Sequence, residues 1–337
     1  MILPSQRLSE LIASGAVAGA PTDSDSLPTT LQPASLDLRL GGTAFRMRAS
    51  FLPGEGKTVQ AGLDALCLHS FDMADGAVLE TGCIYLIPIM ESLDLSGRPK
   101  LSAIANPKSS TGRLDVFARL IGDGSTRFDA LPPGYRGPLW LEVAPRTFPV
   151  LVRPGDRLSQ LRIREGAPEP LSRQTVSIDL TADGDGPIGY RARRHSGMVD
   201  LRGVGAHRAL DYWEPVRITN HGLILEPEEF YILRSREAVE IPVGQAAEMA
   251  PIDTEIGEFR AHYAGFFDPG FGVAAQGGSG SRAVLEVRGR DVPFLLSDGQ
   301  PVAHLVFEAM SAVPDALYGD AGSSYQAQGL RLSKHFA

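Results

Sequence analysis

One short segment of the sequence, NPKSSTGR, concentrates the residue types that bind phosphate. It contains two cations and two hydroxyls around a turn, at Lys108, Ser109, Ser110 and Arg113. Cationic side chains, hydroxyls and the free backbone N–H groups of a turn together form a nest for an anion. The competing interpretation is a solvated turn rich in serine and lysine. The spacing is not that of a nucleotide-binding Walker loop.

Two further segments each place a carboxylate in a predicted β-hairpin. The first, FDALPPGYRGPLWLEV, carries Asp129 and Glu142, and the second, from FFDPGFG to AVLEV, carries Asp268 and Glu286. Neighbouring side chains of a strand point in opposite directions, so a glutamate between two apolar residues can project into a cleft. There it can act as a general base. A surface glutamate is the alternative for each residue taken alone.

Zinc chemistry is disfavoured by what the sequence lacks. The H-x-E and P-C-x-x-C signature of zinc deaminases is absent, and the seven histidines form no close pair at metal-ligand spacing,. The two cysteines, Cys67 and Cys83, cannot form a disulfide framework,. We expect no metal held by the protein's own side chains.

Composition limits the partners of the chain. The formal net charge of −8 over 337 residues argues against binding a nucleic-acid polymer, although a local basic pocket for one small anion remains compatible with it,. The N-terminus does not resemble a signal peptide, and no apolar run is long enough to span a membrane,. We therefore expect a cytoplasmic protein.

The elements that position these residues are predominantly short strands. Apart from a helix predicted at residues 5–14, with Ser5 as its N-cap and Gly15 as its stop, the chain alternates apolar and polar residues between turns rich in glycine and proline,. The clearest predicted strands are 35–41, 83–89, 139–143, 148–153, 158–163, 283–289 and 303–308. This pattern predicts an all-β protein.

The strand pattern occurs twice. Leu79, Glu80 and Tyr85 recur as Leu225, Glu226 and Tyr231 at one constant offset, and the tripeptide LEV recurs at nearly the same offset. Two diverged copies of one β-domain explain this order. We predict a first domain at 1–168, a second at 169–312, and a C-terminal lid segment at 313–337.

The predicted lid is poor in large apolar residues. It carries Tyr318, Tyr325 and Gln328, which could fold over a bound ligand,. Its glycine and serine content suggests that burial does not anchor it. A chain ending at Met310 is then expected to fold but to show little activity.

Taken together, the motifs resemble those of the dCTP deaminases in the dUTPase-like superfamily. The resemblance is carried, in order, by QPASLDLRLG, NPKSSTGRLDV, GYRGPLWLEV, RPGDRLSQL and SSYQAQG. It covers residues 5–165 and resumes in the second copy and the tail, as in a long, duplicated form. The resemblance implies tandem dUTPase-like domains of the jelly-roll-like, β-clip type, which assemble as a trimer with active sites between subunits. A homo-oligomer is therefore expected.

The resemblance also implies roles for the candidate residues. Triphosphate, accompanied by Mg²⁺ and not zinc, would be held by Lys108, Ser109, Ser110, Arg113, Tyr318, Tyr325 and Gln328. Base and sugar would contact Asp129, Trp140, Ala264, Gly265, Asp268 and Val284. The catalytic group would comprise Ser109, Arg113 and either Glu142 or Glu286.

Departures from the family pattern favour one glutamate. The first copy has ALPP after Asp129 where the family has an immediate Pro-Gly, whereas the second keeps Asp268-Pro269-Gly270. The second copy has no serine loop, since it reads MAPIDTEIGEFR there. We therefore predict a composite site in which the first copy's loop faces the second copy's hairpin, with Glu286 as base. A site between first copies of different chains, using Glu142, is the alternative.

The expected reaction is zinc-independent deamination of dCTP to dUTP and ammonia. A carboxylate can act first as base toward water and then as acid toward departing ammonia, and burial would raise its pKa toward working pH. The nearest alternative is a dUTPase, or a bifunctional enzyme that performs both steps. A non-catalytic nucleotide-binding or assembly module is the alternative of another class.

Overall fold

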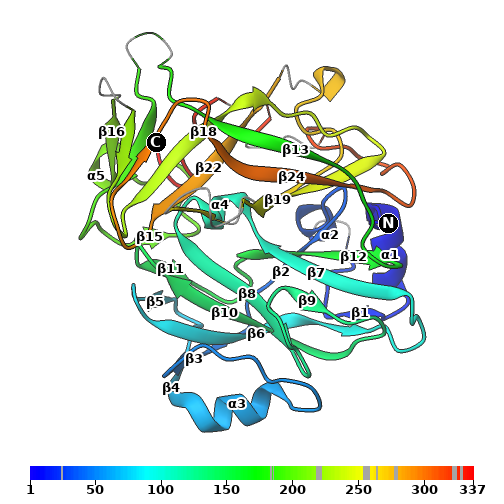
Figure 1. Ribbon diagram of the computed structural model, residues 1–337. Coiled ribbons are helices and arrows are strands. Elements are labelled where there is room, and N and C mark those ends of the chain that lie inside the picture. The colour runs from blue at the N-terminus through cyan, green and yellow to red at the C-terminus, as the bar shows by residue number, and fades with distance from the viewer. Residues whose placement is uncertain are drawn as a thin grey trace.

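The computed structural model describes residues 1–23, 26–182, 184, 186–217, 222–252, 259–262, 265–276, 280–320, 325–326 and 329–337. The chain is predominantly β, as the sequence predicts. Its strands form two halves, with the N-terminal half below and the C-terminal half above in Figure 1.

Two sheets form most of the first half. One has the order β4 (Cys67–Asp72), β3 (Thr43–Met47), β6 (Ile84–Asp94), β10 (Arg136–Pro145) and β8 (Val116–Gly122), and β1 (Val17–Ala18) pairs with β6. The other has the order β2 (Leu36–Leu38), β12 (Ser159–Glu165), β7 (Leu101–Pro107) and β9 (Ala130–Leu131). β7 alternates buried and half-buried residues, as a strand with one face on the core does,.

The second half is built around one large sheet. Its order is β16 (Trp213–Val216), β14 (Gly189–Ala192), β18 (Phe230–Ala238), β13 (Pro170–Asp179), β24 (Pro301–Ala309), β19 (Gln245–Pro251) and β21 (Phe266–Phe267). β22 (Arg282–Gly289) lies between β18 and β20 (Phe259–His262), and β17 (Leu223–Leu225) pairs with β23 (Phe294–Leu296). β15 (Val199–Asp200) pairs in parallel with β11 (Val150–Val152) of the first half, which also pairs with β5 (Ala77–Leu79).

The helices of the described chain are short. They are α1 (Ser5–Ala13), α2 (Leu27–Thr30), α3 (Val59–Leu66), α4 (Ser109–Gly112), α5 (Ala209–Tyr212) and a 3₁₀ turn (Ala274–Gln276). The predicted N-terminal helix is present, but its N-cap is Pro4, because Ser5 already has helical geometry. α3 was not predicted. Thr58 caps it by accepting a hydrogen bond from the Ala61 N–H at 3.3 Å.

The same strand pairing recurs in the two halves. In the first, Glu142 of β10 lies opposite Leu86 of β6, and the Tyr85 hydroxyl accepts a hydrogen bond from the Glu80 N–H at 3.1 Å. In the second, Glu286 of β22 lies opposite Ile232 of β18. The Tyr231 hydroxyl there accepts from the Glu226 N–H at 3.0 Å. The two glutamates therefore occupy equivalent register positions.

Buried contacts join the halves. The first core cluster continues into the second half through Trp213, Phe230, Ile232 and Val284. Ion pairs between buried or largely buried side chains also cross the boundary, namely Arg113–Glu286, Asp115–Arg288, Arg162–Asp268 and Arg164–Glu308. A buried charge is costly unless paired, so these pairs fix how the halves dock.

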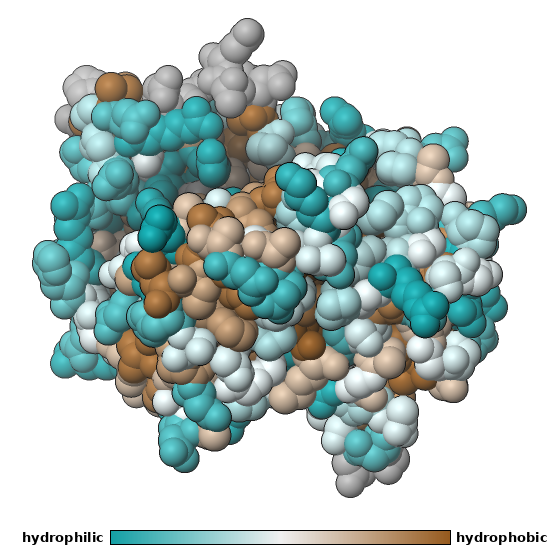
Figure 2. Space-filling model, turned by 90° about the horizontal axis from the view of Figure 1, so that it is seen from below, coloured by the Kyte–Doolittle hydropathy of each residue, from teal (hydrophilic) through white to brown (hydrophobic). Residues whose placement is uncertain are grey.

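Apolar side chains gather on part of the lower face of the molecule (Figure 2). Exposed apolar side chains of the first half include Leu68, Val78 and Met90, on β4, β5 and β6.

Candidate active site

A cavity of about 660 Å³ lies between the two halves. The first half contributes residues around α2 and the serine loop, the segment 108–113 that contains α4. The second half contributes residues 265–271 and β22, and the C-terminal segment contributes Tyr318, Tyr325 and Lys334. The cavity therefore needs both halves and the tail of one chain.

The serine loop begins where β7 ends. Lys108 is extended, and its N–H donates to the Leu158 carbonyl at 2.9 Å, which ties the loop to the residue before β12. The chain then turns into α4, and the N–H groups of Thr111 and Gly112 donate to the Lys108 carbonyl. Lys108 forms an ion pair with buried Asp37. Lys108, Ser109, Ser110 and Arg113 all line the cavity, so the structure brings the predicted cluster together.

Glu286 is the buried carboxylate on the opposite wall. It is 1% exposed, and Val284, two residues earlier on β22, lies on the same strand face and also lines the cavity,. Its Oε1 lies 3.9 Å from Nε of Arg113, and its Oε2 has no hydrogen-bond partner among the described residues. Burial raises the pKa of Glu286 to about 8, although Arg113 opposes this shift. The side chain is thus poised to exchange a proton near neutral pH.

Arg113 connects the loop, the tail and the glutamate. Its guanidinium lies over the Tyr325 ring, 4.0 Å from the centroid, and its Nη1 donates to the Arg331 carbonyl at 3.1 Å. Burial lowers its pKa, and the charge of Glu286 acts against that shift. The cation is thereby held between the loop and the carboxylate.

Gly265 lies close to the backbone at the start of the serine loop. A Cβ at this position would lie 2.7 Å from the Pro107 carbonyl oxygen, so a larger residue would push the hairpin away from the loop. Gly265 lines the cavity, as predicted for a base or sugar contact. Ala264, the predicted contact beside it, lies outside the described residues.

Asp268 lines the cavity, but its carboxylate already has a partner. Its Oδ1 accepts from Nη2 of Arg162 at 2.8 Å, and the same nitrogen donates to the Phe267 carbonyl. Burial raises the pKa of Asp268, and Arg162 opposes the shift. Asp268 therefore holds the hairpin against β12 of the first half.

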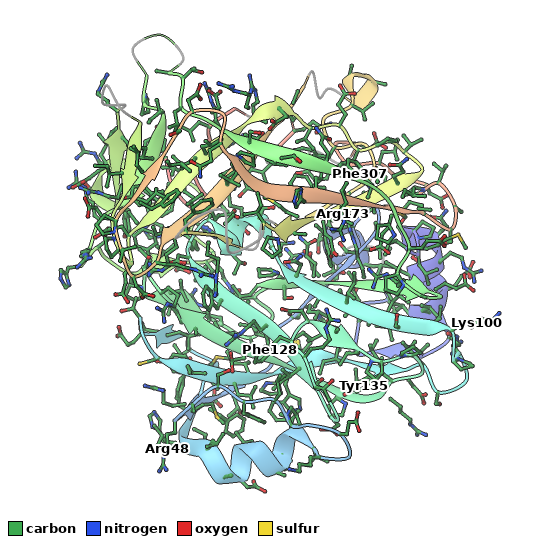
Figure 3. All side chains as sticks on the ribbon, viewed as in Figure 1. Arg48, Lys100, Phe128, Tyr135, Arg173 and Phe307 are labelled. Carbon is green, nitrogen blue, oxygen red and sulfur yellow. The ribbon has the colours of Figure 1, made fainter. Side chains whose placement is uncertain are left out.

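The structure does not bring the first-half candidates Asp129, Trp140 and Glu142 to this cavity. Within one chain these three side chains therefore do not share a site with the serine loop, and the alternative site between first copies of different chains, with Glu142 as base, stays a prediction. Glu142 is paired with Arg119, whose Nε donates at 3.0 Å. The Arg119 guanidinium stacks 4.1 Å from the centroid of Phe128, which Figure 3 places in the lower half of the molecule.

Asp129 and Trp140, the other two first-half candidates, form contacts within the first half. Asp129 has a left-handed backbone, and its Oδ1 accepts from the Leu120 N–H at 2.7 Å. Burial raises its pKa to about 7. Trp140 packs against Phe45, with ring centroids 6.2 Å apart, in the cluster that α3 covers. The unpredicted helix α3 thus closes over this region of the first half.

Part of the C-terminal segment lies over the cavity. Tyr318 and Tyr325 both line it, and Tyr318 packs on Phe271 with centroids 5.4 Å apart. Gln328 lies outside the described residues.

The end of the tail corrects one expectation, because burial does anchor it. Ser333 and His335 are 1% and 3% exposed, and the Ser333 hydroxyl donates to the carbonyl of Ser110 in the serine loop at 2.9 Å. Phe336 packs among aromatic rings that include Phe148 and Trp213. The few aromatic and polar residues at the chain end thus suffice to dock it.

We therefore expect deletion of residues 329–337 to destabilise the fold as well as the site. The physical reason is the loss of the Phe336 contacts and of the buried hydrogen bond to Ser110. The free energy of unfolding, measured by urea denaturation, should fall by about 2 kcal/mol or more. An unchanged unfolding midpoint would show that the tail end contributes no stability.

Several lining residues carried no recognisable signal in the sequence. Lys334 lies between this cavity and a neighbouring one of about 510 Å³, and forms no ion pair with a described residue. Burial lowers its pKa, and Lys108 and Arg157 add to the shift. Leu27, Leu31 and three phenylalanines, Phe266, Phe267 and Phe271, add apolar walls. Only the FFDPGF motif could have suggested the phenylalanines.

The described residues include no group of three or more His, Cys, Asp or Glu side chains placed to hold a metal ion. The donor set of the cavity, with its lysines, arginine and hydroxyls, suits an anion and does not suit a cation,. None of the described helices is long and apolar enough to cross a membrane.

A β protein that sets a cationic, hydroxyl-lined loop against a buried carboxylate has the site of an enzyme acting on a phosphorylated substrate. Comparison with known families identifies which one. The model of the 2′-deoxycytidine 5′-triphosphate deaminase N-terminal domain matches residues 1–167, and that of the C-terminal domain matches residues 157–336. The chain belongs to the dCTP deaminase family.

Individual relatives agree with this assignment. The crystal structure of 2′-deoxycytidine 5′-triphosphate deaminase from Agrobacterium tumefaciens superposes with a TM-score of 0.86 at 48% identity, covering 93% of this chain and 99% of the other. A dUMP-forming dCTP deaminase of Methanopyrus kandleri is 28% identical over 161 residues, 48% of this chain and 79% of the relative. A dCTP deaminase of Halorubrum lacusprofundi is 28% identical over 167 residues, 49% of this chain and 77% of the relative.

Proposed function

We propose that this enzyme removes the amino group from C4 of dCTP by hydrolysis of the C4–N bond, giving dUTP and ammonia. The observation that carries the proposal is the position of Glu286, buried on β22 and facing Arg113 of the serine loop across one cavity. The cavity is also large enough for a nucleotide, and its apolar walls suit a base,.

In the proposed reaction Glu286 handles both protons. Its ionised carboxylate takes a proton from water, and the resulting hydroxide attacks C4 of the cytosine ring. The protonated carboxyl gives this proton to N3 of the ring. The carboxylate then takes the proton of the new C4 hydroxyl and delivers it to the amine, so that the C4–N bond breaks, ammonia leaves and a C4 carbonyl forms. Because burial holds its pKa at about 8, Glu286 can both accept and release a proton near neutral pH,. Ser109 and Arg113 would orient the water and stabilise developing charge.

The triphosphate would lie along the serine loop. Lys108, Ser109, Ser110 and Arg113 supply cations and hydroxyls there, and Lys334 adds a cation at the junction with the second cavity. Tyr318 and Tyr325 would cover it. We propose that Mg²⁺ enters only as a companion of the triphosphate, and no catalytic step is assigned to it.

A dUMP-forming reaction is the competing outcome. One relative is named a dUMP-forming dCTP deaminase, so diphosphate release at the same site is compatible with the family. In that case an activated water would also attack the α-phosphate, and the products would be dUMP, ammonia and pyrophosphate.

We further propose that the two halves are diverged copies of one domain and that the chains form a homo-oligomer. The equivalent registers of Glu142 and Glu286 and the matching Tyr85 and Tyr231 contacts support the duplication. The apolar side chains gathered on the lower face support self-association (Figure 2). Light scattering would give the oligomer mass.

One assay tests the proposed function. The purified protein is incubated with dCTP and Mg²⁺, and dUTP, dUMP, pyrophosphate and ammonia are resolved. We expect ammonia and dUTP in equal amounts, and the same rate after treatment with a zinc-specific chelator, because no described residues form a zinc site,. Equal amounts of dUMP and pyrophosphate would assign the bifunctional reaction. The absence of ammonia, or activity that chelation removes and zinc restores, would contradict the proposal.

A further inference from the structure

Two neighbouring ion pairs join β22 to the serine loop and to the residues that follow it. Arg113, the last residue of the serine loop, and Asp115, two residues later, face Glu286 and Arg288, two residues apart on β22. The Arg113–Glu286 pair lies in the cavity. The second pair has the opposite polarity and lies beside it, with Nη2 of Arg288 at 3.3 Å from Oδ2 of Asp115. The proposed mechanism gives this second pair no role.

Asp115 occupies a position that its surroundings hold firmly. Its side chain is fully buried, and its backbone has φ 55°, a left-handed conformation uncommon for residues other than glycine,. Its Oδ2 accepts a hydrogen bond from the Thr147 hydroxyl at 2.6 Å, and its carbonyl accepts from the Arg146 N–H at 2.9 Å. Its Oδ1 has no hydrogen-bond partner among the described residues. A fixed, buried and partly unsatisfied carboxylate is costly to maintain.

Arg288 links Asp115 to the strand that carries Glu286. Residues two apart on a strand share a face, so Arg288 and Glu286 project from the same side of β22,. The Arg288 side chain is 13% exposed, and its Nη1 donates to the Glu228 carbonyl. The guanidinium therefore bridges the first half and the turn before β18, which fixes the end of β22 against the loop.

We propose that Asp115, acting through Arg288, is a positioning residue that sets the distance between Glu286 and Arg113. This inference rests on the proposed deamination, and concerns a residue that touches neither the cavity nor the substrate. Without Asp115, β22 would lose its ion pair through Arg288, and Glu286 would no longer be held at a fixed distance from Arg113.

Because charged groups surround Glu286, the pH dependence of the activity provides a test of the proposal. Arg113 faces it from the loop, Arg288 flanks it on its own strand, and Tyr318 and Tyr325 lie on the tail wall. On β20, His262 occupies the opposite register position, and its side chain is outside the described part. The negative charge of Asp115 raises the pKa of Glu286, adding to the larger effect of burial. Neutralising Asp115 should therefore lower the pKa of Glu286.

The test compares Asp115→Asn with a matched control, Glu308→Gln. Both changes neutralise a buried carboxylate that pairs with an arginine of the other half, but Glu308, bonded to Arg164, does not line the cavity. Asparagine tolerates the left-handed backbone at position 115, so the fold should persist. For Asp115→Asn we expect kcat for dCTP to fall by about 10- to 100-fold with a small change in KM. The apparent pKa of kcat/KM should move to lower pH, whereas Glu308→Gln should keep the wild-type kcat and profile.

Equal behaviour of the two variants, with no displaced pH profile, would overturn the inference. If Asp115→Asn did not fold, Arg288→Met would carry the test, with the same expected loss of kcat. Failure of the wild-type enzyme to release ammonia from dCTP would instead contradict the proposed function, so the two failures are distinguishable.

Discussion

Replacing Glu286 with glutamine is expected to reduce the turnover of dCTP by about 10²- to 10⁴-fold, the usual contribution of a general base. Glutamine keeps the shape of the side chain but cannot accept a proton from water. Glu142→Gln is the matched control, because Glu142 has the equivalent register position on β10 and is equally buried. It is paired with Arg119 and lies outside the cavity, so this variant should keep most of the activity. Steady-state release of ammonia measures both.

The opposite outcome would assign catalysis to Glu142 and to a site between chains. If neither change reduced turnover, deamination by a carboxylate base would be wrong.

A stability measurement shows independently whether Glu286 is buried with a raised pKa. Its folded-state pKa of about 8 lies above the ordinary value of 4.5, so the folded state keeps a proton that the unfolded state loses first. The unfolding free energy of the wild type should therefore gain from this proton at low pH and lose that gain as pH rises from about 4.5 to about 8. Glu286→Gln has no such proton, so its unfolding free energy should fall less over that range.

Replacing Arg113 with alanine is expected to weaken dCTP binding by about 10- to 100-fold, which corresponds to the loss of one charge-assisted hydrogen bond. The change also removes the stacking on Tyr325 and the cation nearest Glu286. Turnover should therefore fall as well. Titration calorimetry with dCTP measures the affinity directly.

The control for Arg113→Ala is Arg119→Ala. Arg119 also pairs with a buried glutamate and stacks on an aromatic ring. Its partners, Glu142 and Phe128, belong to the first half and do not line the cavity. We expect Arg119→Ala to bind dCTP as the wild type does. Equal affinity of the Arg113 variant and the wild type would show that the serine loop does not bind the triphosphate through Arg113.

The strands and the serine loop were predictable because their signals are local. Of the two predicted strands 83–89 and 283–289, residues 84–89 lie in β6 and all of 283–289 lies in β22, and the phosphate-binding residue types are adjacent in the chain. The position of Glu286 opposite the serine loop was also partly predictable, because the second hairpin keeps its Pro-Gly turn.

Other features depend on contacts between distant residues. Nothing in the sequence near Asp268 indicates that Arg162 holds its carboxylate, nor that Arg119 pairs with Glu142. The helix α3 is short and was not distinguished from the strands around it. The tail was judged by its glycine and serine content, whereas the docking of Phe336 depends on rings supplied by Phe148 and Trp213.

Under the proposed mechanism, one chain supplies both walls of the active site. A crystal structure of the Glu286→Gln variant with dCTP and Mg²⁺ tests it most directly. We predict phosphates on Ser109 and Arg113, and cytosine C4 beside residue 286 of the same chain. A nucleotide bound with its cytosine against Glu142 would contradict the claim.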